Sequence, residues 1–165
     1  MSTYAFVDTY AYTATYVTDK LLLSVKEIIR ESGLSVSKMS KEWVSLERGI
    51  STWIRSKHLE KIVLEIFDPN TSGLITRWDL EIVYGYGGDG SMWADTDAIR
   101  YSIKKAGVIP ASCNYEIRVT NKPNWPTVEG WSTCRLRSTA GLSRYSIGTS
   151  VGGSGLGADI AYWGR

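Results

Sequence analysis

The sequence predicts an α+β domain in which helices pack on a mainly antiparallel sheet. Two amphipathic helical patterns come first, with apolar stripes between Leu21 and Trp53. Two β-rich segments joined by a turn follow at 59–86, and a third helical pattern covers 95–107. A strand-like segment at 115–120 and a glycine-rich, β-capable tail complete the order. This order of elements, read from apolar periodicity and turn residues, indicates the α+β class.

Length and composition exclude several kinds of protein. A chain of 165 residues suits one domain, and such a chain buries roughly 70% of its unfolded surface without needing metals or disulfides. His58, Cys113 and Cys134 are too few for the usual structural zinc site. The formal net charge of +2 argues against a strongly basic nucleic-acid coat. No charged segment followed by an apolar run opens the chain, and no apolar stretch approaches the roughly 20 residues of a membrane span, so we expect a cytoplasmic protein.

The first segment has two interpretations. Residues 3–16 alternate Thr and Tyr in a way typical of a strand, yet they run directly into a helix, so an early helical start remains open. Thr18 or Asp19 is expected to cap that helix, and Gly33 to end it. Its apolar stripe contains Leu21, Leu22, Val25, Ile28 and Ile29.

The second helix has an amphipathic pattern that is typical of core packing. Ser37 or Ser40 is its expected N-cap. Its stripe is Met39, Trp43, Leu46, Ile50 and Trp53.

A β-hairpin is predicted next, with strands at 59–67 and 74–86 around a turn at 68–73. One face of the second strand is predicted to be buried and contains Leu74, Thr76, Trp78, Leu80, Ile82 and Tyr84. The other face contains Arg77, Asp79 and Glu81, and we expect it to be exposed to water.

The third helix has suitable charges at both ends. Asp95 is its expected N-cap, Asp97 suits the positive first turn, and Lys104 and Lys105 suit the last turn before Gly107.

The tail differs in composition, since seven of the 16 glycines fall between Gly141 and Gly164. Short strands are predicted at 132–138, 144–151 and 158–163. The tail is either a mobile segment with more than one hydrogen-bonded arrangement or a plain hairpin with a frayed end.

No catalytic constellation is found. The G-x-G-x-x-A match at 153–158 has no room for a crossover helix, and neither a phosphate-binding loop nor a nucleophile elbow is present. Asp89, Asp95 and Asp97 offer the alternative of a metal-dependent hydrolase, although a polar turn and a helix start explain them more simply. His58 has no partner carboxylate or nucleophile at motif spacing.

A small nucleic-acid-binding module is a second alternative. Single strands bind to surfaces that combine cationic and aromatic side chains. The tail offers Arg135, Arg137 and Arg144 with Trp131, Tyr145 and Trp163.

Several segments together resemble the bacterial HORMA-domain family, over essentially the whole chain. Their order and spacing carry the resemblance, not any one motif. They are Tyr16-Val17-Thr18-Asp19-Lys20, His58-Leu59-Glu60-Lys61, Arg77-Trp78-Asp79, Trp93-Ala94-Asp95-Thr96-Asp97, Leu136-Arg137-Ser138-Thr139 and the glycine-rich ending through Tyr162-Trp163.

This resemblance implies a HORMA fold without enzymatic activity or cofactor. Such proteins bind a closure-motif peptide as an added strand, and a C-terminal safety belt wraps over it. We therefore expect a single domain, 1–165, with a core at 1–129 and a candidate belt at 130–165. The expected peptide-binding residues are Ile99, Ile103, Tyr115, Ile117, Val119, Trp131, Leu136, Tyr145, Ile147 and Trp163.

The resemblance also implies partners. Similar bacterial proteins are sensors of cyclic-oligonucleotide-based antiphage signalling systems (CBASS). There the closed form activates a cGAS/DncV-like nucleotidyltransferase that makes a second messenger, and an AAA+ ATPase reopens it. By analogy we expect the remodeller to engage residues 2–16.

Overall fold

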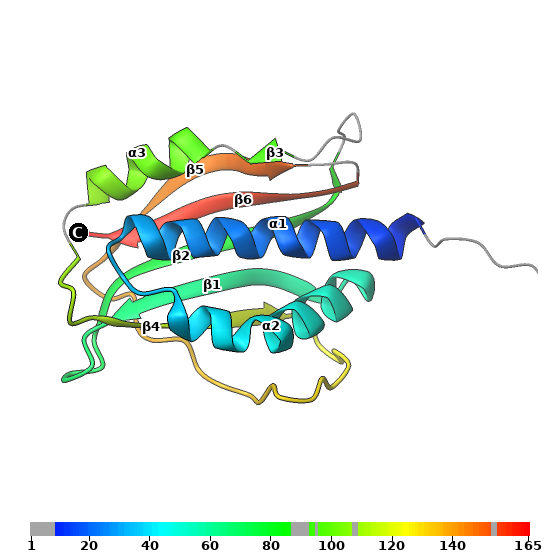
Figure 1. Ribbon diagram of the computed structural model, residues 1–165, viewed down its shortest axis with the longest axis horizontal. Helices are drawn as coiled ribbons and strands as arrows, with labels where there is room; N and C mark the ends of the chain where they lie inside the picture. Colours follow the sequence, from blue (N-terminus) through cyan, green and yellow to red (C-terminus); the bar gives the residue numbers. More distant parts are fainter. Residues whose placement is uncertain (1–8, 87–92, 95, 107–108, 153–154) are drawn as a thin grey trace, which may run out of the picture.

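The computed structural model of the chain describes residues 9–86, 93–94, 96–106, 109–152 and 155–165. Within these residues three helices lie on one face of a six-stranded sheet (Figure 1). The elements are α1 (Thr9–Glu31), α2 (Ser37–Arg55), β1 (Leu59–Phe67), β2 (Leu74–Tyr86), β3 (Trp93–Ala94), α3 (Thr96–Ala106), β4 (Asn114–Asn121), β5 (Ser143–Gly152) and β6 (Gly155–Gly164). The strands lie in the order β3-β5-β6-β2-β1-β4, and each neighbouring pair is antiparallel. The predicted α+β class is confirmed.

The first helix begins earlier than its apolar stripe indicates. α1 starts at Thr9, so the helical alternative holds for the described part of 3–16 and the strand prediction is wrong there. Ala14 and Val17 are fully buried and continue the helical spacing of the stripe toward the N-terminus. Burial of this stripe outweighs the strand preference of Thr and Tyr, since intrinsic propensities differ by only about 1 kcal/mol or less.

At α1 the predicted C-terminal residue is confirmed, and both predicted N-caps are wrong. Gly33 ends the helix with φ of 82° and donates its N–H to the Arg30 carbonyl at 3.0 Å, as a left-handed C′ residue does. Thr18 and Asp19 lie inside the helix instead of capping it. The Thr18 hydroxyl donates to the Ala14 carbonyl at 2.7 Å, because the preceding residues continue the helix and leave it no free N-terminus to cap.

α2 confirms its predicted stripe, with Met39, Leu46, Ile50 and Trp53 buried and Trp43 half-buried. Its predicted cap is wrong, because Ser37 is already the first helical residue and Ser40 lies within the helix. The Ser37 N–H instead finds the Ser35 hydroxyl oxygen at 3.2 Å.

The central hairpin has the bounds that the sequence predicts. β1 and β2 pair in a register that places Leu64 opposite Trp78. The strand predicted at 115–120 is β4, which pairs with the other edge of β1 and places Val119 opposite Ile62. The apolar side chains of these strands pack under α1 and α2, and this layer forms the core.

The C-terminal hairpin is an integral part of the sheet. β6 lies between β2 and β5, and its Leu156, Ala158 and Ile160 are fully buried. The alternative of a frayed end is therefore wrong for the described part of the tail. The strands predicted at 144–151 and 158–163 are confirmed within β5 and β6, whereas 132–138 forms no strand.

The charged face of β2 is not wet, contrary to the prediction. Arg77 and Asp79 are only 7% and 4% exposed. The Arg77 guanidinium donates two hydrogen bonds of 2.8 Å to Asp79, and it lies 5.3 Å from the centre of the Trp163 ring. Long side chains that lie flat on a sheet can cover one another in this way. Only Glu81 of the three is exposed.

α3 carries the charges that the sequence predicts, with Asp97 in its first turn and Lys104 and Lys105 in its last. Asp95 and Gly107 lie outside the described residues.

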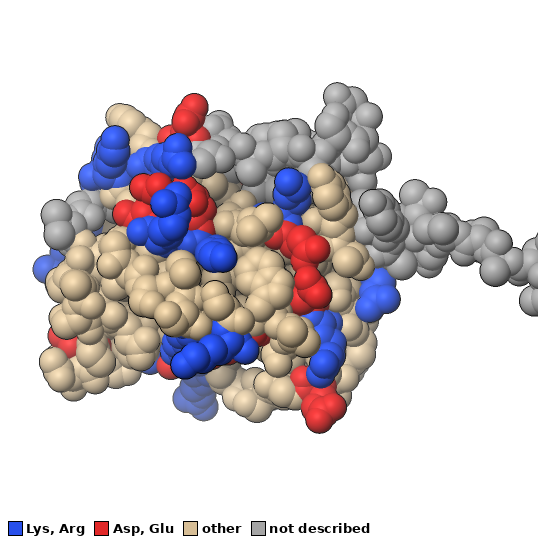
Figure 2. Space-filling view, in the orientation of Figure 1, with Lys and Arg blue, Asp and Glu red and all other residues tan. Residues whose placement is uncertain are grey.

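Ion pairs join α3 to α1. Arg100 lies 3.1 Å from Glu27 and 3.4 Å from Glu31, and Arg30 pairs with the same two carboxylates. Figure 2 shows these charges gathered where the two helices meet, beside a largely uncharged surface. The hydrogen bond from Arg30 lowers the pKa of Glu27 by more than burial raises it, so this pKa lies below its usual value.

Candidate functional site

β4 is the last strand of the sheet, so only one of its edges pairs with β1. Three bonds show which of its backbone groups face outward. The Tyr115 N–H donates to the Asn114 side-chain oxygen at 2.8 Å, and the Tyr115 carbonyl accepts from Lys38 Nζ at 2.7 Å. At the other end the Lys122 N–H turns inward to the His58 carbonyl at 2.7 Å. Odd-numbered residues of β4 therefore direct their backbone groups away from the sheet, since these directions alternate along a strand.

Ile117 and Val119 are the outward residues in the middle of β4. Among the described residues, no turn, loop or strand backbone bonds to their N–H and C=O groups. A row of unbonded groups on an edge strand is a template for another strand. The structure therefore presents a short open edge next to side chains of α2.

Residues 122–142 form a strap that joins β4 to β5 without a regular element. In Figure 1 the strap leaves one end of β4, passes outside β4 and α2, and returns at the other end of β4. Two clusters of side chains hold the strap, one on the helix side of the sheet and one on the opposite face.

A tryptophan cluster, Trp53, Trp125 and Trp131, holds the strap on α2. The Trp53 ring meets Trp131 edge-on at 5.0 Å and Trp125 edge-on at 5.8 Å between ring centres. The Trp131 indole donates to the Ser45 carbonyl at 2.8 Å, and the Trp53 indole donates to the Pro126 carbonyl at 2.7 Å. Each of these bonds joins α2 to the strap.

Gly49 makes this contact possible. A Cβ on Gly49 would lie 2.3 Å from Trp131 Nε1, which is far inside van der Waals contact. Glycine in a helix interior costs about 1 kcal/mol relative to alanine. α2 therefore carries a residue that weakens the helix but leaves room for the strap.

A second cluster, formed around Glu65, holds the strap on the opposite face. Glu65 is completely buried, and its neighbours Leu64 and Ile66 belong to the core under the helices, so Glu65 faces away from them. Arg118 Nε and Arg137 Nη1 lie 2.8 Å and 2.9 Å from Glu65 Oε1. The Arg137 backbone N–H donates to Glu65 Oε2 at 2.6 Å.

Further contacts strengthen the position of Arg137 in the strap. Its guanidinium lies 3.5 Å from the centre of the Phe67 ring, and its Nε donates to the Ser72 carbonyl at 3.1 Å. Glu116 contacts both Arg118 and Arg137. Burial raises the pKa of Glu116, but the hydrogen bond and charge of Arg118 and the charge of Arg137 outweigh it and lower the pKa overall.

The slot between the outer edge of β4 and the strap is a cavity of about 310 Å³. Its lining consists of Trp53, Val119, Thr120, Asn121, Trp125, Trp131, Ser132, Thr133 and Cys134. Thr120 and Asn121 also carry buried side-chain oxygens, Oγ1 and Oδ1, that have no hydrogen-bond partner in the described part of the chain.

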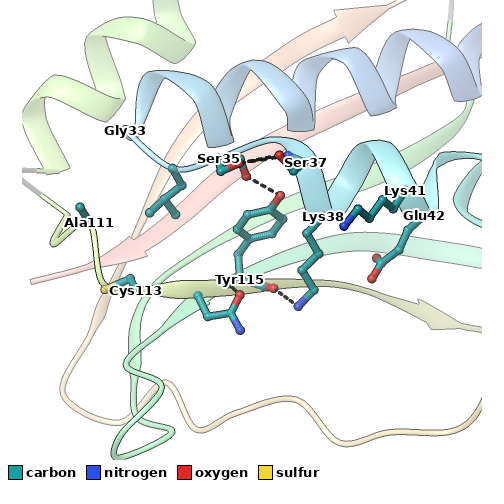
Figure 3. A pocket seen from close by; sticks show the side chains of 11 residues that line it. Gly33, Ser35, Ser37, Lys38, Lys41, Glu42, Ala111, Cys113 and Tyr115 are labelled. Carbon is teal, nitrogen blue, oxygen red and sulfur yellow. Dashed lines mark hydrogen bonds between the residues drawn. The ribbon is translucent and has the colours of Figure 1, made fainter.

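A second pocket, of about 450 Å³, lies at the start of β4 beside the first turn of α2 (Figure 3). Lys38, Lys41, Glu42 and the half-buried Cys113 line it. Burial raises the pKa of the Cys113 thiol, and the charge of Asp68 adds to the effect. The two pockets thus lie at the two ends of the outer edge of β4.

The predicted site residues separate into two groups. The first lies on β4 and the strap: Tyr115, Ile117, Val119, Trp131 and Leu136. The second lies on α3, β5 and β6, away from β4: Ile99, Ile103, Tyr145, Ile147 and Trp163. Ile99 and Ile103 are buried in α3, which packs on α1 and β5. Three strands, β6, β2 and β1, lie between β5 and β4, so the structure does not bring the two isoleucines under an added strand at β4.

Sequence reasoning missed the residues that attach the strap. Trp53 was predicted only as a core residue, and Gly49, Glu65 and Lys38 were not singled out. One signal for Glu65 was present, because it is a lone charge in the apolar run 62–67 and a buried charge needs a partner.

The described residues give little support to the two alternative functions, a metal-dependent hydrolase and a nucleic-acid-binding module. Among the described residues no group of His, Cys, Asp or Glu is arranged to hold a metal ion, and Asp89 and Asp95 lie outside that part of the chain. The residues of the nucleic-acid hypothesis do not form one surface, since Trp131 is docked on α2 and Arg137 on Glu65, while Arg144 and Tyr145 lie on β5.

Solved structures share this fold. A chain of a mitotic checkpoint complex superposes with a TM-score of 0.74 at 12% identity, covering 93% of this chain and 98% of that chain. C. elegans HTP-2 bound to the HIM-3 closure motif gives 0.71 at 11% identity, covering 98% of each chain. A chain of the E. coli MS115-1 HORMA:CdnC:Trip13 complex gives 0.57 at 9% identity, covering 98% of this chain and 96% of that chain. The fold is therefore the HORMA fold.

A family model described as Bacterial HORMA domain 2 matches residues 1–165. The chain belongs to this bacterial HORMA-domain family, and the resemblance seen in the sequence is confirmed. Comparison with curated protein sequences gives no match.

In the described part of the chain, none of the helices combines the length and the apolar character needed to cross a bilayer.

Proposed function

We propose that this chain is a non-enzymatic adaptor that binds a closure-motif peptide as an added strand on the outer edge of β4. The observation that carries the proposal is the unbonded outward backbone of Ile117 and Val119 beside the strap. Main-chain bonds supply affinity in such complexes, and side-chain pockets supply specificity. The HTP-2 structures with bound closure motifs support this use of the fold.

The strap at 122–142 acts as the safety belt in this proposal. The sequence led us to expect a belt at 130–165, whereas the proposed belt begins earlier, at the end of β4, and stops before β5 and β6, which belong to the sheet. The peptide contacts are then Tyr115, Ile117, Val119, Trp131 and Leu136, while the predicted residues of α3, β5 and β6 support the fold.

Closure is a two-state switch in which the bound peptide stabilises the closed strap by its higher affinity for that state. Moving such an equilibrium from 1:99 to 99:1 needs roughly a 10⁴-fold difference in affinity between the two states. The tryptophan cluster and the Glu65 cluster supply part of the closed-state stability before any peptide binds.

The closed form would then bind and activate a cGAS/DncV-like nucleotidyltransferase in the cytoplasm, as part of a CBASS antiphage response. An AAA+ ATPase would reopen it and stop the second-messenger signal. The HORMA:CdnC:Trip13 complex of E. coli supports both partners. A reconstituted nucleotidyltransferase should become active only with the chain and a bound peptide, and the ATPase with ATP should reverse that activity.

Strand addition is tested with Ile117→Pro. This variant removes one outward N–H and leaves the ladder with β1 intact, because the inward bonds of β4 belong to its even-numbered residues. Peptides selected from a displayed library of random 12-residue sequences should bind the wild-type chain and lose at least about tenfold in affinity to Ile117→Pro.

The matched control is Ile117→Val, which keeps the N–H and should bind within about threefold of wild type. Circular dichroism and thermal melting must show that both variants fold. Unchanged peptide affinity in a folded Ile117→Pro protein would refute strand addition at β4.

A further inference from the structure

The two ends of the outer edge of β4 differ in chemistry. Near Val119 the slot is bounded by the rings of Trp53, Trp125 and Trp131. Near Tyr115 the second pocket is bounded by Lys38 and Lys41. An added strand that runs the length of β4 meets both ends, so the two ends select for different side chains on it.

The slot suits a bulky apolar side chain. Its walls on the α2 side are indole rings in edge-on contact, and such rings bind other aromatic or large aliphatic groups well. A cavity of about 310 Å³ is at the lower limit of the size of ligand pockets, which fits one large side chain and the adjoining backbone.

Lys38 occupies a backbone carbonyl that an added strand would use. Its ammonium donates to the outward carbonyl of Tyr115, which is the acceptor that the next N–H of an added strand requires (Figure 3). A strand that extends to Tyr115 takes over this carbonyl and displaces the ammonium. Lys38 Nζ, which lies 5.7 Å from the centre of the Tyr115 ring in the structure, then needs a new acceptor. A carboxylate on the added strand provides the strongest one.

The charges around this pocket favour an anion. Neither Lys38 nor Lys41 forms an ion pair within the described residues. Glu42 lines the same pocket, which leaves one net positive charge in the lining. Glu116 also feels the charge of Lys38, but its carboxylate is already bound by Arg118. An incoming acidic side chain therefore meets the two unpaired cations Lys38 and Lys41 in the lining, against the carboxylate of Glu42 and that of Asp68 beside Cys113.

We infer that the segment bound at β4, if strand addition is its mode of binding, has a bulky apolar side chain in the slot and an acidic side chain four to six residues away along the strand, at Lys38. The spacing follows from the separation of Tyr115 from Val119 and Asn121, about 13–20 Å of extended chain at ~3.3 Å per residue. The partner is thus an acidic-apolar linear segment.

The test uses the full chain and a displayed library of random 12-residue peptides. Sequences selected on the wild-type chain should share an aromatic or large aliphatic residue and, four to six positions away, Asp or Glu. In synthetic versions of a selected peptide, replacing that acid by its amide should weaken binding about fivefold to tenfold in fluorescence polarisation. The same amide replacement should have no effect on binding to Lys38→Gln.

Charge reversal gives an independent test. A library selected on Lys38→Glu should yield Lys or Arg at the position where wild type yields an acid, and Lys41→Glu is a second variant should the first fail to fold. Lys104→Glu on α3, far from β4, is the matched control and should select the wild-type pattern.

The outcomes separate this inference from the proposed function. Peptides that bind in an Ile117→Pro-sensitive way, but without an acidic preference or with a basic one, overturn the inference and leave strand addition standing. Peptides that ignore Ile117→Pro overturn strand addition and the inference together. Enrichment of the acidic-apolar pattern with a reversed preference in Lys38→Glu supports both.

Discussion

The two halves of the C-terminal third are held in opposite ways. β6 is bonded along both edges, to β2 and β5, and its Leu156 and Ile160 are fully buried. The strap has no ladder within 122–142 and depends on side chains, chiefly Trp131 on α2 and Arg137 on Glu65. A segment with many cooperative bonds opens only with the whole fold, whereas one with a few side-chain attachments opens locally. The comparison predicts that the strap detaches from the domain more readily than the hairpin leaves the sheet.

The largest effect should come from β6. Ile160→Ala removes a fully buried side chain between β2 and β5 and should lower the free energy of unfolding by about 2–5 kcal/mol. Urea unfolding followed by circular dichroism measures it. The comparable truncation in the strap, Leu136→Ala, should cost less than about 1 kcal/mol, because Leu136 is half-buried. Equal losses in the two variants would erase the contrast between the regions.

A smaller effect is expected at the Glu65 cluster. Glu65→Gln leaves Arg118 and Arg137 without their buried counter-charge, which should cost about 2 kcal/mol. Hydrogen exchange should accelerate in residues 130–142 and remain slow in β6. The exposed Glu60→Gln on the same strand is the control and should change neither. Faster exchange in β6 as well would mean that the strap and the hairpin open together.

Gly49→Ala tests the other attachment. Alanine favours the helix by about 1 kcal/mol, yet its Cβ collides with Trp131, so the indole should leave α2 and its fluorescence should shift to the red. We expect a net loss of about 1 kcal/mol. In a Trp131→Ala background the same Gly49→Ala change should become stabilising, because only the helix preference remains. A stabilising effect in both backgrounds would show that Trp131 does not need the glycine.

The smallest effect should come from the contact between α1 and α2. A hydrogen bond with Asp19, together with burial, raises the pKa of Glu47. The folded chain therefore binds this proton more tightly than the unfolded chain, and ionised Glu47 costs stability above its pKa. Glu47→Gln should stabilise the fold by about 0.5 kcal/mol at pH 7.5 in urea titrations. The gain should shrink as the pH falls through the pKa of Glu47, and a gain that persists unchanged at pH 4 would argue against the raised pKa of Glu47.

Local patterns predicted the elements well and their long-range pairing less well. The α2 stripe and the bounds of β1 and β2 follow from periodicity and turn residues within short windows. The insertion of β6 beside β2 joins residues about 80 positions apart, such as Leu80 and Ile160, and no local pattern specifies it. The burial of Arg77 also depends on a distant residue, Trp163.

The candidate site shows the same division. Ile117 and Val119 were predicted as part of a strand, because their alternation with polar and charged residues is visible in sequence. The strap attachments were not, since Trp53 looks like any other residue of an apolar stripe until its indole meets the Pro126 carbonyl. Ile99 and Ile103 were grouped with β4 by order along the chain, which does not determine position across a sheet.

The strap continues into folded strands at both of its ends, β4 on one side and β5 on the other. With both side-chain attachments made, strap and sheet form a closed ring around whatever lies along β4. A chain inside a ring leaves by sliding lengthwise or when the ring opens, so the lifetime of a chain that cannot slide is set by the opening rate of the ring and not by the strength of its own contacts. A segment with a folded body on each side is then mechanically interlocked with the domain, and even modest affinity is compatible with a long-lived complex.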